Sequence, residues 1–326
     1  MYYAETHSFD PCYNLAFEEY LLTHKSEGDW LMLWQNKNTV VVGLNQNTCE
    51  EINSDFVRNK GITVVRRTTG GGAVYHDLGN LNYSFITGAG SAEEISIEKF
   101  SKPVCEALAA LGVNASVSGR NDILIDGKKV SGVAQRVYCG RILHHGTLLF
   151  RSDTEMISGA LNADPEKFSS KSTKSVRSRV GNIADYLPSE MTIADFKAEL
   201  LRRLSGGGAE LYEPSEQELV MIRQAAEEKY RSDSWTYGRD LAYTFRNKRR
   251  FSGGTLEVKL LVKDDIIQEA HFAGDFMATS DCHGLERSFQ GLAFNRAAVM
   301  TLLAEHDLGS IFGGISPEEI VSSFFE

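Results

Sequence analysis

The chain has 326 residues, of which 42% are hydrophobic and 24% are charged, as in most soluble globular proteins. Its 34 Lys and Arg against 44 Asp and Glu give a net charge of −10, which excludes a protein that binds mainly to nucleic-acid phosphates. No apolar run approaches the ~18–20 residues that cross a bilayer, and the N-terminus does not resemble a secretory signal. The five cysteines form no CxxC pair. We therefore expect a cytoplasmic protein with no membrane partner.

Hydrophobic periodicity predicts an α/β (α+β) chain in which helices flank a mixed sheet. The expected helices are 13–24, with Asn14 at the cap position, and 51–61, 98–112, 153–161, 192–204 and 214–231. The expected strands are 30–35, 39–46, 62–67 and 79–86. Residues 121–150 predict a meander of three strands joined by tight turns at Asp126-Gly127 and Cys139-Gly140.

A change of composition near the C-terminus predicts a second, smaller domain. The run RNKRRFSGG at 246–254 is basic and then glycine-rich, which is typical of a linker or hinge. Beyond it, 255–274 predicts a hairpin of two or three strands, and 284–306 and 316–325 predict helices. We therefore expect a catalytic domain at 1–245 and an accessory domain at 246–326.

The segment RRTTGGGAVYHD at 66–77 is the strongest candidate for a ligand-binding loop. Three consecutive glycines after a strand let backbone N–H groups approach a ligand, and the two arginines add positive charge. This pattern predicts an anion cradle, although it is neither a Walker loop nor a GxGxxG turn. A second triplet at 206–208 has no strand before it and no polar cluster after it, and we interpret it as a linker.

A second candidate is NDILIDGKKVSGVAQ at 121–135, where a hairpin can bring Asp122 and Lys129 to one ligand. A carboxylate beside Asn121 suits magnesium shared with phosphates, and a lysine on a strand suits charge growing on an oxygen atom. An exposed hairpin with a solvated Lys128–Lys129 tip is an equally good interpretation of these residues alone.

Two other polar groups have less specific patterns. His144 and His145 are adjacent on a strand, so they point to opposite faces, and no third ligand completes a zinc site. One histidine of the pair is expected to face the pocket near Gly146. The basic run KSTKSVRSR at 171–179 is by default a solvated loop, and a clamp for polyphosphate is the alternative.

Taken in order, these motifs resemble the bacterial two-domain lipoate-protein ligases of the biotin/lipoate protein ligase family. The matching segments are NLAFEEYLL, RRTTGGGAVYHDLGNLNYSF, NDILIDGKKVSGVAQ, HHGTLLF and KSVRSRVGNI, followed by a small α/β C-terminal domain. The resemblance implies ATP-dependent activation of lipoate to lipoyl-AMP with release of pyrophosphate. The lipoyl group then passes to the ε-amine of one lysine on a lipoyl domain.

The resemblance also assigns roles to residues of this chain. It implies that Lys129 is catalytic, that Asp122 lies nearest magnesium, and that Arg67, Lys129 and His145 bind lipoate. His76 and Asp77 are implied to line the same pocket. The residues implied to contact ATP and lipoyl-AMP are Arg67, Gly71, Gly72, Ala73, Val74, Tyr75, His76, Asn121, Asp122 and Lys129.

The implied partners are lipoyl domains of 2-oxoacid dehydrogenase complexes, the glycine cleavage H protein, or both, and no nucleic acid. Two alternatives stay open. A cysteine-dependent octanoyl or lipoyl transferase on the same fold would use no ATP, but it needs a thiol beside the lysine, and no cysteine lies between Cys139 and Cys282. A lipoate-binding relative without activity would have no need for the glycine loop and Lys129.

Overall fold

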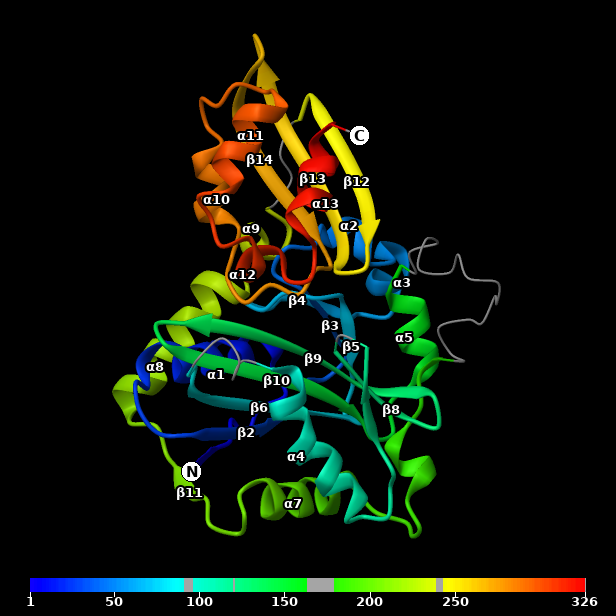
Figure 1. Cartoon of the computed structure of the whole chain (residues 1–326). Coiled ribbons are helices and arrows are strands. Elements are labelled where there is room, and N and C mark those ends of the chain that lie inside the picture. The colour runs from blue at the N-terminus through cyan, green and yellow to red at the C-terminus, as the bar shows by residue number, and fades with distance from the viewer. Residues whose placement is uncertain (91–95, 120, 163–178, 239–242, 326) are drawn as a thin grey trace. The chain divides into compact units, whose positions relative to one another are not determined.

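The computed structural model describes residues 1–90, 96–119, 121–162, 179–238 and 243–325 (Figure 1). Its contacts divide the chain into two compact units. The first unit comprises Met1–Val41, Ile52–Val65 and Val74–Ser232, and the second comprises Val42–Glu51, Arg66–Ala73 and Asp233–Glu326. Within the described ranges, no helix is both long and apolar enough to span a membrane.

The first unit is built on an eight-stranded mixed sheet with the strand order β11-β1-β2-β6-β10-β9-β8-β7. Strand β1 runs parallel to β2 and β11, and the other neighbours are antiparallel. The strands are β1 (Tyr2–Ala4), β2 (Trp30–Trp34), β6 (Asn80–Gly88), β7 (Ser116–Ser118), β8 (Asp122–Ile125), β9 (Lys128–Tyr138), β10 (Arg141–Leu149) and β11 (Glu210–Tyr212). The predicted meander is confirmed.

Helices cover both faces of this sheet (Figure 1). Helices α1 (Pro11–His24) and α8 (Glu216–Ala225), with the π-helical turn η4 (Ala226–Tyr230), lie on one face. Helices α4 (Ile97–Ala109) and α7 (Ile193–Leu204) pack on the other, over the main apolar core. The predicted cap at Asn14 is wrong, because Asp10 caps α1 while the Asn14 amide is buried and donates to backbone and to Asn36.

Shorter elements lie between residues 39 and 76 and after β10. A three-stranded sheet has the order β4-β3-β5, with β3 (Thr39–Val42), β4 (Thr63–Arg66) and β5 (Val74–His76). The predicted helix 51–61 is in fact α2 (Thr48–Glu51) and α3 (Ser54–Asn59), because the Asn53 side chain caps a new helix. The predicted strand 39–46 ends at Val42. Helix α5 (Thr154–Ala160) and the 3₁₀ turn η3 (Ile183–Tyr186) follow β10.

The two predicted hairpin turns are confirmed by their backbone geometry. Asp126 and Gly127 have φ of 49° and 76°, and Cys139 and Gly140 have φ of 46° and 74°. Two successive residues with positive φ form the turn that matches the twist of the flanking strands. These turns therefore fix the order of β8, β9 and β10.

The C-terminal part of the second unit is an antiparallel sheet of β12 (Phe245–Phe251), β13 (Gly254–Lys263) and β14 (Ile266–Gly274). Helices α10 (His283–Ser288), α11 (Arg296–Leu303), α12 (Leu308–Phe312) and α13 (Pro317–Phe325) enclose a phenylalanine-rich core, and α9 (Asp233–Tyr237) precedes the sheet. The predicted linker at 246–254 is wrong, because the basic run alternates along strand β12. Its Arg246 and Lys248 pair with Glu50.

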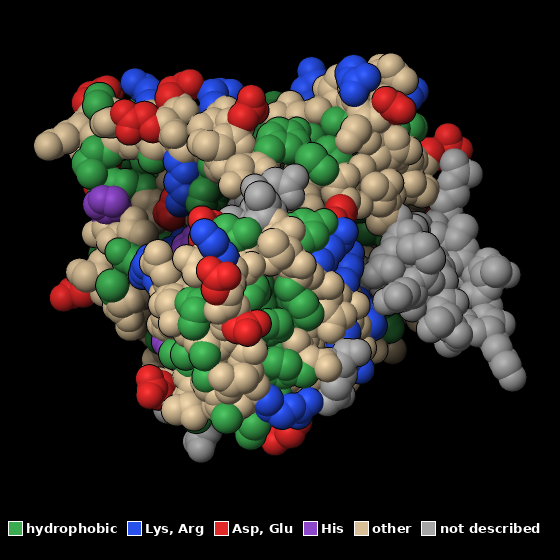
Figure 2. Space-filling model, turned by 90° about the horizontal axis from the view of Figure 1, so that it is seen from above, with side chains coloured by type: hydrophobic (Ala, Val, Ile, Leu, Met, Phe, Trp, Pro, Cys, Tyr) green, Lys and Arg blue, Asp and Glu red, His purple; other side chains and the backbone are tan. Residues whose placement is uncertain are grey.

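The predicted helix 284–306 is also wrong in its length, since α10 and α11 are separate. Gly291, with φ of 82°, lies in the break between them, and Asn295 caps α11. On the face shown in Figure 2, lysine and arginine side chains are interspersed with acidic ones.

Candidate active site

A row of residues crosses five neighbouring strands on one face of the large sheet. The register places Trp34 of β2 opposite Asn82 of β6, and Asn82 opposite Thr147 of β10. The N–H of Gly132 on β9 donates to Thr147 Oγ1 at 3.1 Å, and Asp122 of β8 is opposite Gly132. Opposite residues of paired strands share a face, so this row lines one continuous surface.

A β-bulge brings Lys129 onto the same surface. The β8–β9 register shifts between Ile123 and Leu124, so β9 carries an extra residue there. Without it, strand alternation would put Lys129 and Gly132 on opposite faces. Lys129 Nζ instead lies 2.7 Å from Asp122 Oδ1, and a Cβ on Gly132 would come within 3.0 Å of that Nζ. The glycine therefore leaves the space that the ammonium group occupies.

Hydrogen bonds fix both ends of this lysine site. Asn121 makes two bonds to Val133: its backbone carbonyl accepts from the Val133 N–H at 2.9 Å, and its side-chain Nδ2 donates to the Val133 carbonyl at 3.2 Å. The Lys129 carbonyl accepts from the Gly181 N–H at 2.9 Å. The structure thus brings together the predicted residues Asn121, Asp122 and Lys129, and the exposed-hairpin interpretation does not describe Lys129.

A buried carboxylate and an imidazole lie on the same face as the row. Ser84 Oγ accepts from Trp34 Nε1 at 2.9 Å and donates to Glu18 Oε1 at 2.5 Å. His145 Nδ1 lies 2.9 Å from the same carboxylate oxygen, and Glu18 is only 2% exposed. The register sets His145 opposite Ser84, two residues before Thr147. The Trp34 indole of β2, the Glu18 carboxylate of α1 and the His145 imidazole of β10 therefore meet beside the row.

His144 points to the opposite face, as strand alternation predicts. It is completely buried, stacks on Phe100 with ring centroids 5.0 Å apart, and has Nδ1 3.0 Å from Gln135 Nε2. Burial, together with a smaller contribution from the nearby His145, lowers the pKa of His144 to about 3. His144 is therefore a neutral core residue.

The residues after the glycine loop differ in accessibility. Tyr75 is buried and donates to Asn38 Oδ1 at 2.9 Å, and burial raises its pKa to about 12. His76 is buried as well, with Nδ1 3.2 Å from Asn36 Nδ2. Val74 is only half-buried. Asp77 accepts from the N–H groups of Gly79 and Asp153, so its carboxylate closes a turn.

The two arginines of the glycine motif have different roles in the second unit. Arg66 is completely buried, and its guanidinium joins residues 43–48 to residues 235–236. It donates to the carbonyls of Gly43, Leu44, Gln46, Trp235 and Thr236 and to the Thr48 hydroxyl. Arg66 is thus a structural residue.

Arg67 shapes the glycine loop itself. Its Nη2 donates to the carbonyls of Gly70 and Gly72 at 2.6 and 2.9 Å. Gly71 has φ of 85°, and its N–H donates to the Phe276 carbonyl at 3.1 Å. Nothing lies within 4 Å of the place where a Cβ on Gly72 would be. The loop is therefore held from the side of Arg67 and open at Gly72.

The predicted site residues are divided between the two units. Arg67, Gly71, Gly72 and Ala73 belong to the second unit, whereas Val74, Tyr75, His76, Asn121, Asp122, Lys129 and His145 belong to the first. The basic run at 171–179 lies outside the described residues, except for exposed Arg179.

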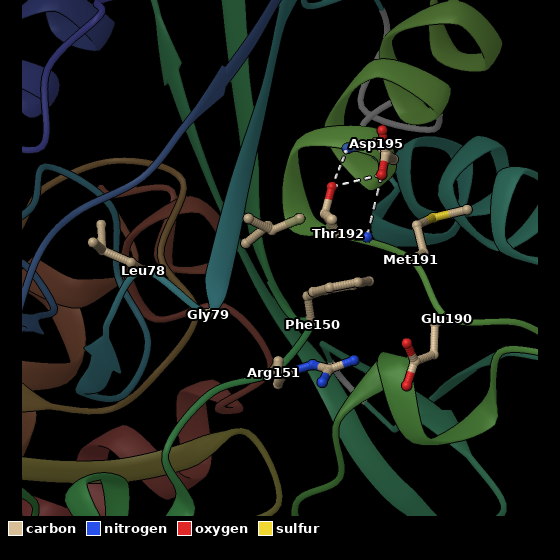
Figure 3. Close-up of a pocket in the computed structure, with 9 residues that line it drawn as sticks. Leu78, Gly79, Phe150, Arg151, Glu190, Met191, Thr192 and Asp195 are labelled. Atoms are coloured by element: carbon tan, nitrogen blue, oxygen red, sulfur yellow. Dashed lines mark hydrogen bonds between the residues drawn. The ribbon is translucent and has the colours of Figure 1, made fainter.

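A cavity of about 560 Å³ lies elsewhere in the first unit (Figure 3). It is lined by Leu78, Gly79, Phe150, Arg151, Glu190, Met191, Thr192, Ile193 and Asp195. It includes none of the predicted site residues. In the part of the chain that the structure describes, no three His, Cys, Asp or Glu side chains are grouped so that they could hold a metal ion.

Sequence reasoning missed Thr147, which accepts from Gly132 at the lysine site, and it missed Glu18 and Ser84, which contact each other on the same sheet face. All three are distant from Lys129 in the sequence, and strand register and helix packing decide their places. The one local signal was Gly132 directly after Ser131, since a strand glycine often marks a close approach.

The chain is similar to known proteins over most of its length. Residues 10–205 match the family described as the lipoyl protein ligase A/B catalytic domain, and residues 240–324 match the bacterial lipoate protein ligase C-terminus. The lipoate-protein ligase LplJ of Bacillus subtilis is 40% identical over 321 residues, covering 97% of both chains.

Two solved structures are similar. Plasmodium falciparum LipL1 in complex with lipoate covers 98% of both chains with a TM-score of 0.83, and at 20% identity it shows the fold alone. Lipoate-protein ligase A bound with ATP is 26% identical, with a TM-score of 0.63, and covers 73% of this chain and 98% of its own. The chain belongs to the lipoate-protein ligase family, and it is an enzyme of that family with the α/β fold expected from its sequence.

Proposed function

We propose that this protein activates lipoate with ATP to lipoyl-AMP, releases pyrophosphate, and transfers the lipoyl group to a lysine of an acceptor protein. The observation that carries the proposal is the Lys129 ammonium, which lies over Gly132 and beside Asp122. Fixed positive charge at such a place is what a reaction between two anions needs.

In the first step, a lipoate carboxylate oxygen attacks the α-phosphorus of ATP, and the bond to the pyrophosphate oxygen breaks. Both partners are negatively charged, so the chain must neutralise their repulsion. Lys129 supplies one cation from a rigid strand. Arg67 is the second predicted cation, and its release from the Gly70 and Gly72 carbonyls would free donors for phosphate.

In the second step, the acceptor amine attacks the lipoyl carbonyl carbon, and AMP leaves with the electrons of the broken C–O bond. A lysine amine has an ordinary pKa of about 10.4, so it must lose a proton before it attacks. Lys129 would stabilise the negative charge that grows on the carbonyl oxygen. This is work for a preorganised donor, which a bulge-fixed strand lysine provides.

Asp122 is the residue of this chain that would hold magnesium. Magnesium is usually bound by one or two carboxylates together with substrate phosphates, and a lone carboxylate next to phosphates fits that pattern. The Asp122 side chain is 34% exposed, which leaves it accessible beside Lys129. When bound, magnesium supplies charge neutralisation of the phosphates.

The acyl chain of lipoate is best placed along the face that carries Trp34, Ser84 and His145. An apolar indole next to a few fixed polar groups is the usual composition of a small-molecule site. The acceptors we propose are lipoyl domains of 2-oxoacid dehydrogenase complexes and the H protein of glycine cleavage. The protein is expected to work in the cytoplasm, since none of its five cysteines, all in the described part of the chain, forms a disulfide.

Neither Cys139 nor Cys12 is suitably placed for the thiol-transferase alternative. Cys139 is exposed in the turn at the far end of β9, which at a strand rise of ~3.3 Å per residue is roughly 30 Å from Lys129. Cys12 is buried, and burial raises its pKa to about 11. A reactive thiol needs a lowered pKa and access.

The test is to incubate the purified chain with lipoate, ATP and magnesium, and then to add separately an E2 lipoyl domain or the H protein. Pyrophosphate release that requires lipoate, lipoyl-AMP in the quenched mixture, and an acceptor heavier by one lipoyl group are expected. Transfer from an acyl thioester without ATP would contradict the proposal.

The matched variant is Cys139→Ser, which should keep the ligation rate within several-fold of wild type because the reaction needs no thiol. A folded Cys139→Ser protein that no longer transfers the lipoyl group would favour the thiol transferase instead.

A further inference from the structure

The ladder of hydrogen bonds between β9 and β10 ends next to the lysine site. The last backbone pair is Gly146 opposite Val133, yet β10 continues to pair with β6 through Leu149. At the next position the Gly132 N–H donates to the Thr147 side chain, at 3.1 Å from Oγ1. A hydroxyl thus takes the place of a backbone carbonyl where β9 leaves the ladder.

Gly132 is the surface against which Lys129 lies. A Cβ at this position would be 3.0 Å from Nζ and 3.1 Å from Cε of Lys129. The Lys129 side chain thus fills the space that the missing Cβ of Gly132 leaves free, and its ammonium group pairs with Asp122 Oδ1 at 2.7 Å. The remaining bond of the Thr147 hydroxyl is weak, with 3.5 Å to the Gly132 carbonyl.

We infer that Thr147 is a positioning residue, which places the Lys129 ammonium by holding Gly132 through its hydroxyl. The inference rests on the proposed function for its effect on ligation, but the placement itself is a property of the protein without ligands. A valine at 147 has nearly the same shape and removes the acceptor, whereas a serine keeps the acceptor and removes a methyl group.

The first measurement does not depend on enzymatic activity. The protein is treated with a trace of acetic anhydride, and acetylation of Lys129 is divided by that of exposed Lys128 in the same peptide. Thr147→Val should raise this ratio several-fold, since the ammonium is no longer held against Gly132 and Asp122. Thr147→Ser should restore the wild-type ratio. An unchanged ratio in Thr147→Val would overturn the inference.

A matched control is Thr255→Val on β13, where a buried threonine Oγ1 accepts a hydrogen bond from Arg250 at 2.7 Å. This variant also loses a strand hydroxyl, and it should leave the labelling ratio unchanged. A rise as large as that of Thr147→Val would show general loosening of the fold and would count against a positioning role.

The second measurement uses the reaction. Thr147→Val should lower kcat for lipoate-dependent pyrophosphate release by roughly 10- to 100-fold, because small misplacement of a reacting group is costly. Combined with Lys129→Ala, the same substitution should lower the residual rate no further. Additive losses would overturn the inference. A wild-type chain without any ligation would refute the proposed function instead, and the labelling ratio would still decide the role of Thr147.

Discussion

Lys129 owes its position to three neighbours and one irregularity of the strand. The bulge turns its side chain to the face of Gly132, Asp122 pairs with the ammonium, and Gly181 holds its carbonyl. Its neighbour Lys128 is exposed at the turn after Gly127. The two lysines are therefore adjacent in the sequence and different in environment.

Substitution of each lysine tests this difference. Lys129→Ala should lower kcat by 10²–10³, the usual loss when one preorganised charge donor is removed. Lys128→Ala should stay within about twofold, because an exposed side chain at a turn contributes little. Steady-state pyrophosphate release measures both, and thermal unfolding checks that both variants fold. Equal losses in the two variants would contradict the assignment.

His144 makes the stability of the protein sensitive to mild acid. Its pKa is about 3 in the folded chain against 6.5 in the unfolded chain, so between these values the unfolded state binds a proton that the native state does not. The contribution of neutral His144 to the free energy of unfolding is therefore full above pH 6.5 and decreases as the pH falls toward 3. Between pH 7 and 5 this single group costs about 2 kcal/mol.

The check is urea unfolding of wild type and His144→Gln at pH 7 and pH 5. The wild-type free energy of unfolding should fall by about 2 kcal/mol more than that of the variant. Parallel decreases in the two proteins would show that His144 carries no such linkage.

At the scale of elements, the glycine loop is held from one side and open on the other. Arg67 donates to the loop carbonyls, and Gly70 touches the chain at Phe276 and Ala278, where a Cβ would lie 2.9 Å from backbone atoms. Gly72 has no neighbour within 4 Å of its Cβ direction. Space at Gly72 is therefore available to a ligand and is not filled by the protein.

Gly72→Val should abolish lipoate-dependent pyrophosphate release while the melting temperature stays near wild type. A Cβ at this position would have no protein atom within 4 Å, so the branched side chain would fill space that a ligand needs. The matched control is Gly208→Val, since Gly208 also has nothing within 4 Å, whereas Gly207 has φ of 77° and would be strained. If both variants turn over alike, the first triplet is only a turn.

The predicted domain boundary at 245 and 246 stays a prediction, and the contacts of Arg66 bear on it. This buried guanidinium donates to the carbonyls of Trp235 and Thr236, which precede that boundary. In any fragment that ends before residue 235, the Arg66 guanidinium lacks two of its hydrogen-bond acceptors. A buried charge without partners lowers the free energy of unfolding by several kcal/mol, so the end point of the fragment should decide its stability.

Fragments 1–245 and 1–232 test this expectation. The longer fragment should melt at a higher temperature and be more soluble. Its free energy of unfolding should exceed that of the shorter fragment by about 3 kcal/mol. Arg66→Met should recover part of the loss in 1–232 and should destabilise the full chain. Equal melting temperatures of the two fragments would show that the Arg66 acceptors contribute nothing.

The sequence alone was sufficient for features that neighbouring residues decide. The turns at Asp126-Gly127 and Cys139-Gly140, the alternation of His144 and His145, and the strands of the meander all follow from local conformational preference. The ordered combination of the glycine motif, the KKVSG segment and HHGTLL was sufficient to identify the family.

Tertiary structure decided what depends on distant partners. Strand register and one bulge put Lys129 over Gly132, and helix packing brought Glu18 to His145, 127 positions apart. The local composition of the basic run at 246–254 predicts a linker, yet the run forms most of β12. Its Arg246 pairs with Glu50, and Phe251 packs against the apolar core. Pairing between segments is set by contacts that no local window contains, and for this reason the faces and partners of the site residues came only from the folded chain.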